Sequence, residues 1–548
     1  MLGLTLIASL ASSASIVSAQ TLPSGFVRES VLSVSAPTAL AFTPDGRMLV
    51  TTQGGRLLVK NGAATEVTAL TFNAASTGAE PKICTESERG LLGVAVDPLF
   101  ASNQFVYLFY TARNGASGTT SCTTGSTYVD GGGNYTPAGK PVNRVSRFTL
   151  GNDSLIVPTT ELVIVNNMPS SAGNHNGGDL HFGKDGHLYV SIGDGGSDYA
   201  GDSGSGGSND AARDKHVLTG KILRVTRTGG VPSDNPFTGA GTGVCAIAGA
   251  TTAGNHCQET FAWGLRNPFR FTMDSNAVGT RFFINDVGQG EREEVDEGKS
   301  GADYGWQCRE GTRVNSTTGK CNPLPASMVD PIFEYPHGGA AVPGTAISGC
   351  NSITGGAFVP NGIWPSAYDN TYLLVDFVCA GVFSIPVSTS PQPVVTSATT
   401  FASGVSSATT LAFGPSGTTQ ALYYTSYATG VSRIRFVRSV DFDGNGIADA
   451  ATDALLLQRY LLGLRGAALV DAARGPNPQR DAVAIASYIA ALGNTLDLDG
   501  DGSVKATTDG LLLLRYLLGL RGAALITGAS ATNRSATDIE NYLLTLLP

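Results

Sequence analysis

Two acidic loops near the C-terminus contain the residue types that bind calcium. Each begins with aspartates at alternate positions, and the two loops start 56 residues apart. Ca²⁺ takes about six to eight oxygen ligands, and alternate carboxylates reach one ion only where the chain turns sharply. The predicted ligands are Asp441, Asp443, Asn445, the carbonyl of Ile447 and Asp453 in the first loop, and Asp497, Asp499, Asp501, the carbonyl of Ser503 and Asp509 in the second.

The two loops resemble those of dockerins and EF-hand proteins, with one departure. The last acidic residue stands at position 13 of each loop and not at position 12, so we expect one extra residue to bulge. The apolar stretches LLLQRYLLGL and LLLLRYLLGL follow the loops. We predict a small all-α domain over residues 441–548, which either docks onto a cohesin-like partner or caps its own chain. The alternative for the loops is an Asp/Gly turn that caps a helix without metal.

The larger N-terminal part contains a second set of reactive side chains. His175 precedes a β-rich run, and a histidine can act as a general base because its pKa lies near neutrality. Arg266 and Asn267 stand in the segment WGLRNPFRF, where a positive charge would stabilise a developing oxyanion. Gly288 and Gln289 lie in a turn followed by several glutamates. Taken singly, each residue is also typical of a structural turn.

A repeated hairpin pattern must position these residues. Two β-rich runs around a Pro/Asp/Gly turn occur at 38–52, 90–111, 178–194, 270–286, 354–376 and 409–427. A radial arrangement lets such a chain avoid long exposed edge strands. We predict a six-bladed β-propeller over residues 25–437, in which long loops between the blades gather at one mouth.

Seven short motifs occur in a fixed order: GLLG, H-x-G-G, IGDGG, GKILRV, LRNP, D-x-G-Q and YGW. In this order they resemble the glucose/sorbosone dehydrogenase family over about residues 30–437. These are six-bladed propellers that use pyrroloquinoline quinone (PQQ), and they include soluble aldose sugar dehydrogenases. The resemblance implies a PQQ- and calcium-dependent enzyme that oxidises an aldose at C1 to the lactone and passes the electrons to an external acceptor.

The resemblance also implies a role for individual residues. His175 matches the base that takes the proton of the anomeric hydroxyl, and Arg266 and Asn267 match residues beside the reactive quinone carbonyls. The remaining cofactor positions are Glu88, Asn174, Gly288 and Gln289, of which the last two hold a Ca²⁺ through their carbonyls. Glu88 and Asn174 replace a Gln and an Asp of the best-studied branch.

The residues that bind the carboxylates of PQQ in the family are not present in this sequence. PQQ has three carboxylates, which the glucose-oxidising branch meets with a Lys and two Arg on the last blades. Cys379, Ser407 and Thr409 stand at or near these positions, and no Lys or Arg occurs over residues 321–432. Unpaired carboxylates in a partly dry site are costly, unless loop cations substitute for the missing ones. Arg213, Lys215 and Lys221 are the candidates.

Two other functions compete with the dehydrogenase. The missing cations favour a binding propeller of the hedgehog-interacting-protein type, which has lost PQQ. A calcium-dependent lactonase-type hydrolase is a further alternative, although no distinctive carboxylate cluster for the central axis is evident in the sequence.

Composition restricts the partners and the compartment. The 548 residues are 14% charged with a net charge of −9 and contain no basic run, which disfavours a nucleic-acid partner. Residues 1–19 form an apolar stretch that ends in Val17-Ser18-Ala19, which predicts a signal peptide rather than a membrane anchor. No later apolar run is long enough to span a membrane. We expect a secreted or periplasmic protein.

Eight cysteines fit disulfides in such a compartment. Short spacings favour Cys245–Cys257 and Cys308–Cys321, which leaves Cys350–Cys379 and Cys84–Cys122. A metal site is the weaker alternative because no C-x-x-C motif occurs.

Overall fold

The computed structural model describes residues 21–23, 25–72, 82–113, 122, 128–129, 134–196, 211–338, 345, 347–417, 419–529 and 533–548. The predicted signal peptide, residues 1–19, lies outside the described residues.

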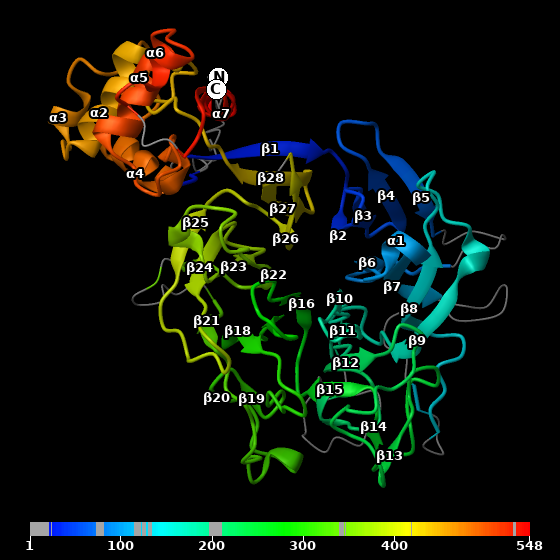
Figure 1. Ribbon diagram of the computed structural model, residues 1–548. Coiled ribbons are helices and arrows are strands. Elements are labelled where there is room, and N and C mark those ends of the chain that lie inside the picture. The colour runs from blue at the N-terminus through cyan, green and yellow to red at the C-terminus, as the bar shows by residue number, and fades with distance from the viewer. Residues whose placement is uncertain are drawn as a thin grey trace, which may run out of the picture.

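Six four-stranded antiparallel sheets surround a common centre (Figure 1). The first blade contains β2 (Pro37–Phe42), β3 (Met48–Thr52), β4 (Arg56–Lys60) and β5 (Val67–Thr71), and the second contains β6 (Leu91–Val96), β7 (Phe105–Arg113), β8 (Pro141–Thr149) and β9 (Leu162–Pro169). The third contains β10 (Leu180–Phe182), β11 (Leu188–Ile192), β12 (Lys221–Val225) and β15 (Thr260–Trp263), and the fourth contains β16 (Pro268–Met273), β17 (Phe282–Asp286), β18 (Arg292–Glu297) and β21 (Phe333–Pro336).

The last two blades complete the ring. The fifth contains β22 (Ile353–Phe358), β23 (Thr371–Asp376), β24 (Val382–Pro386) and β25 (Thr399–Ala402), and the sixth contains β26 (Ala408–Ser416), β27 (Thr419–Ser426), β28 (Gly430–Phe436) and β1 (Phe26–Leu32). The first strands contact one another in the order β2, β6, β10, β16, β22, β26 and back to β2. The predicted six-bladed propeller is therefore confirmed.

The N-terminal strand closes the ring. β1 lies at the outer edge of the sixth blade and pairs with β28, from Phe26 opposite Phe436 to Leu32 opposite Val431. We call this pairing of β1 with β28 the seam. It joins two segments from opposite ends of the propeller sequence.

Smaller elements lie outside the blades. They are β13 (Thr242–Gly243), β14 (His256–Cys257), β19 (Arg309–Glu310), β20 (Arg313–Val314) and the short helix α1 (Phe100–Asn103).

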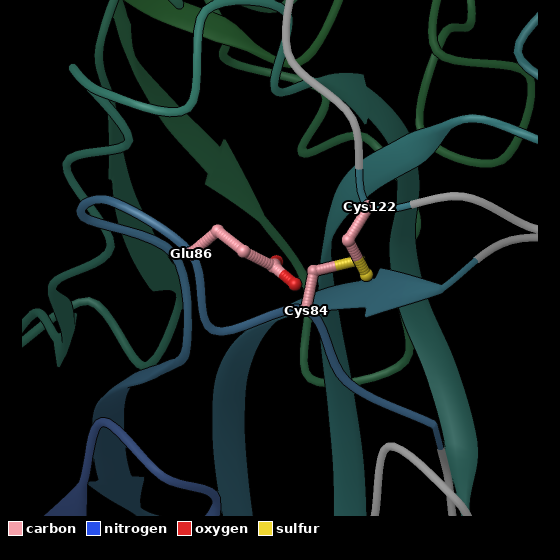
Figure 2. Close-up of side chains that lie close together, drawn as sticks. All are labelled: Cys84, Glu86 and Cys122. Atoms are coloured by element: carbon pink, nitrogen blue, oxygen red, sulfur yellow. A yellow bond between two sulfur atoms is a disulfide. The ribbon is translucent and has the colours of Figure 1, made fainter.

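All four expected disulfides are present: Cys84–Cys122, Cys245–Cys257, Cys308–Cys321 and Cys350–Cys379. Figure 2 shows the first of them, with the Glu86 carboxylate nearby. Because both sulfurs are bonded to each other, they are not thiolate ligands, and this group does not form a metal site.

The C-terminal part is helical, as expected. It contains α2 (Leu455–Leu461), α3 (Ala467–Val470), α4 (Ala482–Leu492), α5 (Leu511–Leu517), α6 (Ala523–Ile526) and α7 (Ala536–Leu544). A π-helical turn precedes each of the two Leu-rich helices, at Ala450–Ala454 and Ala506–Gly510. Each wider turn contains the acidic residue at position 13, so it accommodates the extra residue that the sequence predicted. Within the described ranges, no helix has both the length and the apolar character needed to cross a membrane.

His256 gives the fold a pH dependence that can be measured. Its ring stacks on Phe237 at a centroid distance of 3.7 Å. Burial lowers the pKa of His256 to about 4, and the positive charges of Lys221 and Lys215 add to the shift. The unfolded chain takes up a proton near the ordinary pKa of histidine, about 6.5, and the folded chain does not, so stability falls as the pH drops from about 6.5 to about 4.

In His256→Gln, we expect the free energy of unfolding to fall by about 1 to 2 kcal/mol less over this pH range than in the unmodified protein. The measurement is the difference in unfolding free energy between pH 7 and pH 4.5 for the variant and the unmodified protein. His187→Gln is the control, because that less buried histidine lies in the turn between β10 and β11. Equal pH dependence in the His256 variant and the unmodified protein would contradict the expectation.

Candidate functional site

His175 lies in the loop between β9 and β10 and is only 5% exposed. Its Nδ1 is 2.6 Å from Oδ1 of Asp194, a residue with no solvent exposure. The other oxygen of Asp194 accepts a hydrogen bond from Trp306 Nε1 at 2.9 Å. A carboxylate at Nδ1 selects the tautomer that carries its proton on that nitrogen. Nε2, which has no hydrogen-bond partner among the described residues, is then the nitrogen that accepts a proton.

Arg266 and Asn267 reach the same place from the loop between β15 and β16. Their backbone N–H groups donate to the two oxygens of Asp286, at 2.9 and 2.7 Å. The Asn267 side chain accepts a hydrogen bond from the backbone of Gly177, two residues after the histidine. The third and fourth blades therefore bring His175, Arg266 and Asn267 together.

The Arg266 guanidinium has a fixed position. It donates to the carbonyl of Val287 at 2.8 Å and lies 5.6 Å from the centre of the Trp306 ring. Burial raises the pKa of Asp286 to about 7; the two N–H donors and the charge of Arg266 oppose this rise, and the charge of Asp194 adds to it. The site thus holds an oriented histidine and an arginine, and Trp306 contacts both Asp194, the partner of the histidine, and Arg266.

The turn with Gly288 and Gln289 follows Val287 directly. One oxygen of Glu310 accepts backbone hydrogen bonds from four consecutive residues, 289 to 292, at 2.7 to 3.0 Å. A side chain at position 288 would collide with the carbonyl of Arg292, so only glycine fits there. The turn lies beside Arg266, which donates to the carbonyl of the preceding Val287; binding of Ca²⁺ by Gly288 and Gln289 stays a prediction.

Glu88 and Asn174 also lie next to the histidine. Glu88 accepts the backbone N–H of His175 at 2.9 Å, while Oδ1 of Asn174 is buried without a hydrogen-bond partner in the described residues. A cavity of about 290 Å³ lies next to this group, and Glu88, Phe269, Arg270, Phe377 and Thr409 are among the residues that line it. His175 and Arg266 are not among the lining residues.

Arg270 is the only Lys or Arg that lines this cavity within the described part of the chain. It is 3% exposed, and its N–H groups donate to four oxygens at 2.6 to 3.1 Å. These acceptors are Thr410 Oγ1 and the carbonyls of Phe269, Thr38 and Leu92. One side chain from the fourth blade therefore connects to the first, second and sixth blades.

The positions expected to bind the PQQ carboxylates have other partners. Cys379 is joined to Cys350, and the hydroxyl of Thr409 bonds to the Pro37 carbonyl and to Thr425. Ser407 adopts a positive φ of 52° and is half-buried. None of these residues brings a positive charge to the cavity.

The three loop cations that could replace the missing Lys and Arg make other contacts. Arg213 forms a two-fold ion pair with Asp303, and Lys221 donates to the carbonyls of Asp214 and Thr219. Lys215 lies 4.9 Å from the Trp263 ring centre. Arg213 and Lys215 line a separate cleft of about 570 Å³. Among the described residues, no loop cation therefore takes the place of the missing ones at the cavity.

The C-terminal loops gather their carboxylates. Asp441, Asp443 and Asp453 have ligand oxygens within 4.8 Å of one another, as do Asp497, Asp499 and Asp501 in the second loop. Burial raises the pKa of Asp453 to about 6, and the charges of the other two aspartates add to the rise. Three carboxylates so close together repel one another, which is the arrangement that a divalent cation relieves.

The other predicted ligands occupy equivalent places in the two loops. Asn445 accepts the backbone N–H of Ile447 at 2.8 Å, and Asp501 accepts that of Ser503 at 2.7 Å. Asp509 accepts the N–H of Leu498 at 2.6 Å, as Asp453 does from Phe442.

Three further residues of the site, Asp194, Trp306 and Asp286, were not among the candidates predicted from the sequence. Each stands inside one of the seven motifs, IGDGG, YGW or D-x-G-Q. The motifs contain these residues, but no motif contains both members of a pair: Asp194 bonds to His175 19 positions away and to Trp306 112 positions away.

Comparisons with known proteins agree with this architecture. The model of the Glucose / Sorbosone dehydrogenase family matches residues 34–361. The HIPL2 protein of Arabidopsis thaliana is 28% identical over 336 residues, which cover 54% of this chain and 43% of that protein. The aldose sugar dehydrogenase YliI of Escherichia coli is 29% identical over 274 residues, which cover 49% of this chain and 58% of that protein. The chain thus spans less than two thirds of these relatives.

Solved structures share the fold. The PQQ-bound aldose sugar dehydrogenase of Streptomyces coelicolor aligns with a TM-score of 0.51 and 18% identity over 76% of this chain and 99% of that one. The apo form of the Escherichia coli soluble enzyme aligns with a TM-score of 0.53 and 21% identity over 75% and 99% of the two chains. Since the family model covers more than half of the sequence, this protein belongs to the Glucose / Sorbosone dehydrogenase family.

Proposed function

We propose that the protein is an exported sugar dehydrogenase in which His175 is the general base. The observation that carries this proposal is the hydrogen-bonded row from Trp306 through Asp194 to His175. A buried carboxylate that fixes the tautomer and orientation of an imidazole is the arrangement expected of a general base. If His175 had only a structural role, we would expect Nε2 to have a hydrogen-bond partner as well.

The residues can move one proton and stabilise the charge that forms. Nε2 of His175 takes the proton of the sugar C1 hydroxyl, and Asp194 stabilises the resulting imidazolium. Arg266 offers a positive charge to the oxygen from which the proton leaves. Asn267 holds Gly177 and so keeps the loop of His175 against the fourth blade.

PQQ fits this site only in part. It would supply a two-electron acceptor, with Arg266, Asn267 and the Gly288–Gln289 turn at its reactive end. Its three carboxylates would face a disulfide, two hydroxyl residues and a single arginine whose hydrogen bonds already go to four oxygens. Burying unpaired carboxylates is unfavourable, so the described residues do not match the whole cofactor.

That mismatch favours a second candidate, a binding propeller without PQQ. Relatives named HIPL1 and HIPL2 support it, because they align with this chain about as well as the aldose sugar dehydrogenase YliI does. In this case the His175 site binds a ligand and does not oxidise it.

The C-terminal loops complete the proposal. We infer that residues 441–548 bind two Ca²⁺ ions through the oxygens named above. Docking of a cohesin-like partner by this domain stays a prediction. Four disulfides fit an extracellular or periplasmic protein.

A PQQ titration with and without Ca²⁺ separates the two functions. For the dehydrogenase we expect calcium-dependent binding and reduction of a dye with an aldose. Failure to bind at saturating PQQ and Ca²⁺ would favour the binding propeller. Ser407→Arg then tests the cause: if missing charge prevents binding, this variant gains affinity for PQQ by about tenfold, because a new ion pair is worth about 1 to 2 kcal/mol. Ser407→Gln, which adds length without charge, is the matched control.

A further inference from the structure

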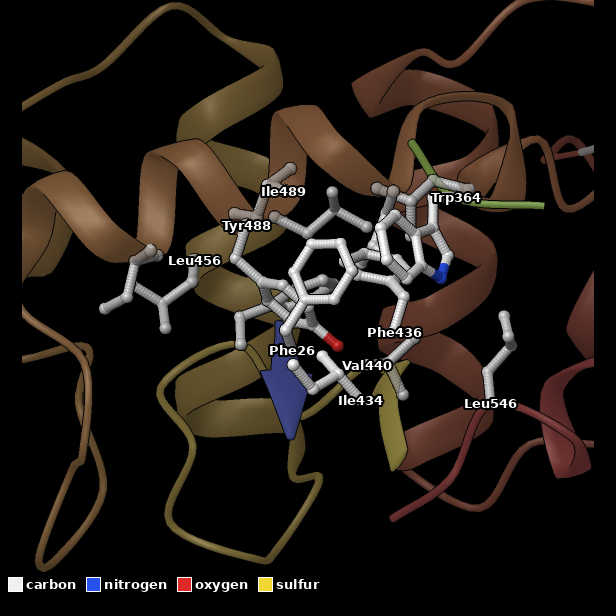
Figure 3. Close-up of a cluster of buried hydrophobic side chains, with 14 of the residues drawn as sticks. Phe26, Trp364, Ile434, Phe436, Val440, Leu456, Tyr488, Ile489 and Leu546 are labelled. Atoms are coloured by element: carbon white, nitrogen blue, oxygen red, sulfur yellow. The ribbon is translucent and has the colours of Figure 1, made fainter. Parts of the chain in front are cut away.

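The C-terminal helices and the propeller share one hydrophobic core at the seam (Figure 3). Phe26 of β1 packs edge-on against Phe436 of β28 at 5.2 Å, and Phe436 lies 6.2 Å from Tyr488 of α4. A side chain at Gly25 would approach Phe436 and Tyr488 to 2.5 and 2.8 Å. The helical domain is therefore packed against the strands that close the ring, with no room for an added methyl group.

Tyr488 also holds the segment that leaves the propeller. Its hydroxyl lies 3.0 and 2.9 Å from the carbonyl oxygens of Val437 and Ser439, and it accepts the backbone N–H of Ser439 at 2.9 Å. This segment connects the end of β28 to the first predicted calcium loop. A displacement of the loop would therefore act directly on the last strand of the propeller.

Arg480 extends this connection into the loop itself. Its guanidinium stacks 4.0 Å from the centre of the Tyr488 ring and donates to the carbonyl of Asp441 at 2.8 Å and to that of Phe442 at 3.2 Å. Asp441 is the first predicted ligand of that loop. The seam, Tyr488 and the loop thus form a continuous series of contacts.

The second repeat has the same local arrangement in a different setting. Arg534 stacks on Tyr542 at 4.6 Å and donates to the carbonyls of Asp497 and Leu498, and the Tyr542 hydroxyl donates to the carbonyl of Thr495. These hydrogen bonds stay within the helical domain. The chain therefore contains its own matched control for the contact that Tyr488 makes with the segment leaving the propeller.

We infer that the C-terminal domain is a calcium-dependent clamp on the seam of the propeller. The inference rests on the calcium sites proposed above. Without a cation, the close carboxylates of Asp441, Asp443 and Asp453 repel one another, and the loop that anchors Arg480 and Tyr488 loosens. With Ca²⁺ the loop is held, and Tyr488 keeps Phe436 and Phe26 in place. β1 lies at a sheet edge and pairs with β28 alone, and Phe26 also packs against Trp364, Tyr368 and Phe401 of the fifth blade, so the clamp adds to this packing.

Hydrogen exchange of the full-length protein tests the clamp. We expect amides of β1 and β28 to exchange at least about tenfold faster in EGTA than in Ca²⁺, because local opening becomes easier. Amides of β11 and β12, far from the helical domain in Figure 1, should keep their rates. A calorimetric Ca²⁺ titration runs in parallel. Absence of calcium binding would overturn the calcium sites and the clamp together; calcium binding without any change in β1 and β28 would overturn the clamp alone.

Two matched pairs of variants locate the effect. Tyr488→Phe and Tyr542→Phe each remove one hydroxyl, and we expect only the first to abolish the effect of Ca²⁺ on the seam. Asp441→Asn and Asp497→Asn each weaken one loop, and we expect only the first to mimic EGTA at β1 and β28. This second pair keeps the test decisive if Tyr488→Phe does not fold. The clamp would be contradicted if Tyr488→Phe and Tyr542→Phe had the same effect on exchange in β1 and β28, and Asp441→Asn and Asp497→Asn did too.

Discussion

His175→Gln should lower the turnover number for aldose oxidation about 100-fold to 10,000-fold, which is the usual contribution of a positioned general base. Glutamine keeps a polar side chain but cannot accept the proton. Asp194→Asn should lower turnover as well, because an amide no longer selects the tautomer with the proton on Nδ1. The measurement is steady-state dye reduction with PQQ, Ca²⁺ and an aldose, with kcat and KM determined separately.

Two further readouts separate catalysis from folding. His187→Gln, in the turn between β10 and β11, should leave kcat unchanged. The pH profile of His175→Gln should lose the limb that reports the base, whereas a merely unfolded fraction would lower the rate equally at all pH values. An unchanged kcat in His175→Gln would exclude His175 as the base.

Arg270→Met should destabilise the propeller by about 3 to 5 kcal/mol, because several buried acceptors lose a charged donor and each such hydrogen bond is worth about 1 to 2 kcal/mol. Methionine has a similar length but no donors, so four oxygens from four blades lose the hydrogen bond from Arg270, although Thr410 Oγ1 still donates to the Thr38 carbonyl. The expected result is a reduced urea midpoint with the cooperative transition retained. Chemical unfolding followed by tryptophan fluorescence measures it.

Arg435→Met is the control for that prediction. Arg435 pairs with Glu29 on the outer strands and is about one third exposed, so its loss should cost at most about 1 kcal/mol. If both variants had the same midpoint, Arg270 would not connect the blades energetically, whatever its hydrogen bonds.

The sequence predicted the fold because its signal is local. Each of the six hairpin patterns corresponds to the first two strands of one blade, from β2 and β3 to β26 and β27. The bulge at position 13 was also predictable, because it follows from the spacing of aspartates in one loop. Both features depend on residues fewer than about 25 positions apart.

The site could be predicted only in part. His175, Arg266 and Asn267 were identifiable from motifs, but Asp194 and Trp306 meet across 112 positions and Arg270 reaches Thr38 across 232. No periodicity reports such contacts. The packing of α4 on the seam was equally hidden, since the Leu-rich helices were compatible with a free docking module.

The seam also has a consequence for the time course of synthesis. Phe26 pairs with Phe436, so the first strand to be made waits for the last strand of the propeller. At about 5 to 20 residues per second, this interval is about 20 to 80 seconds. During that time the five other blades can assemble in order, whereas β1 has no partner in its sheet. The nascent chain therefore carries an unpaired, partly apolar strand for longer than any other part of the propeller, which makes β1 the segment that most needs protection by a chaperone.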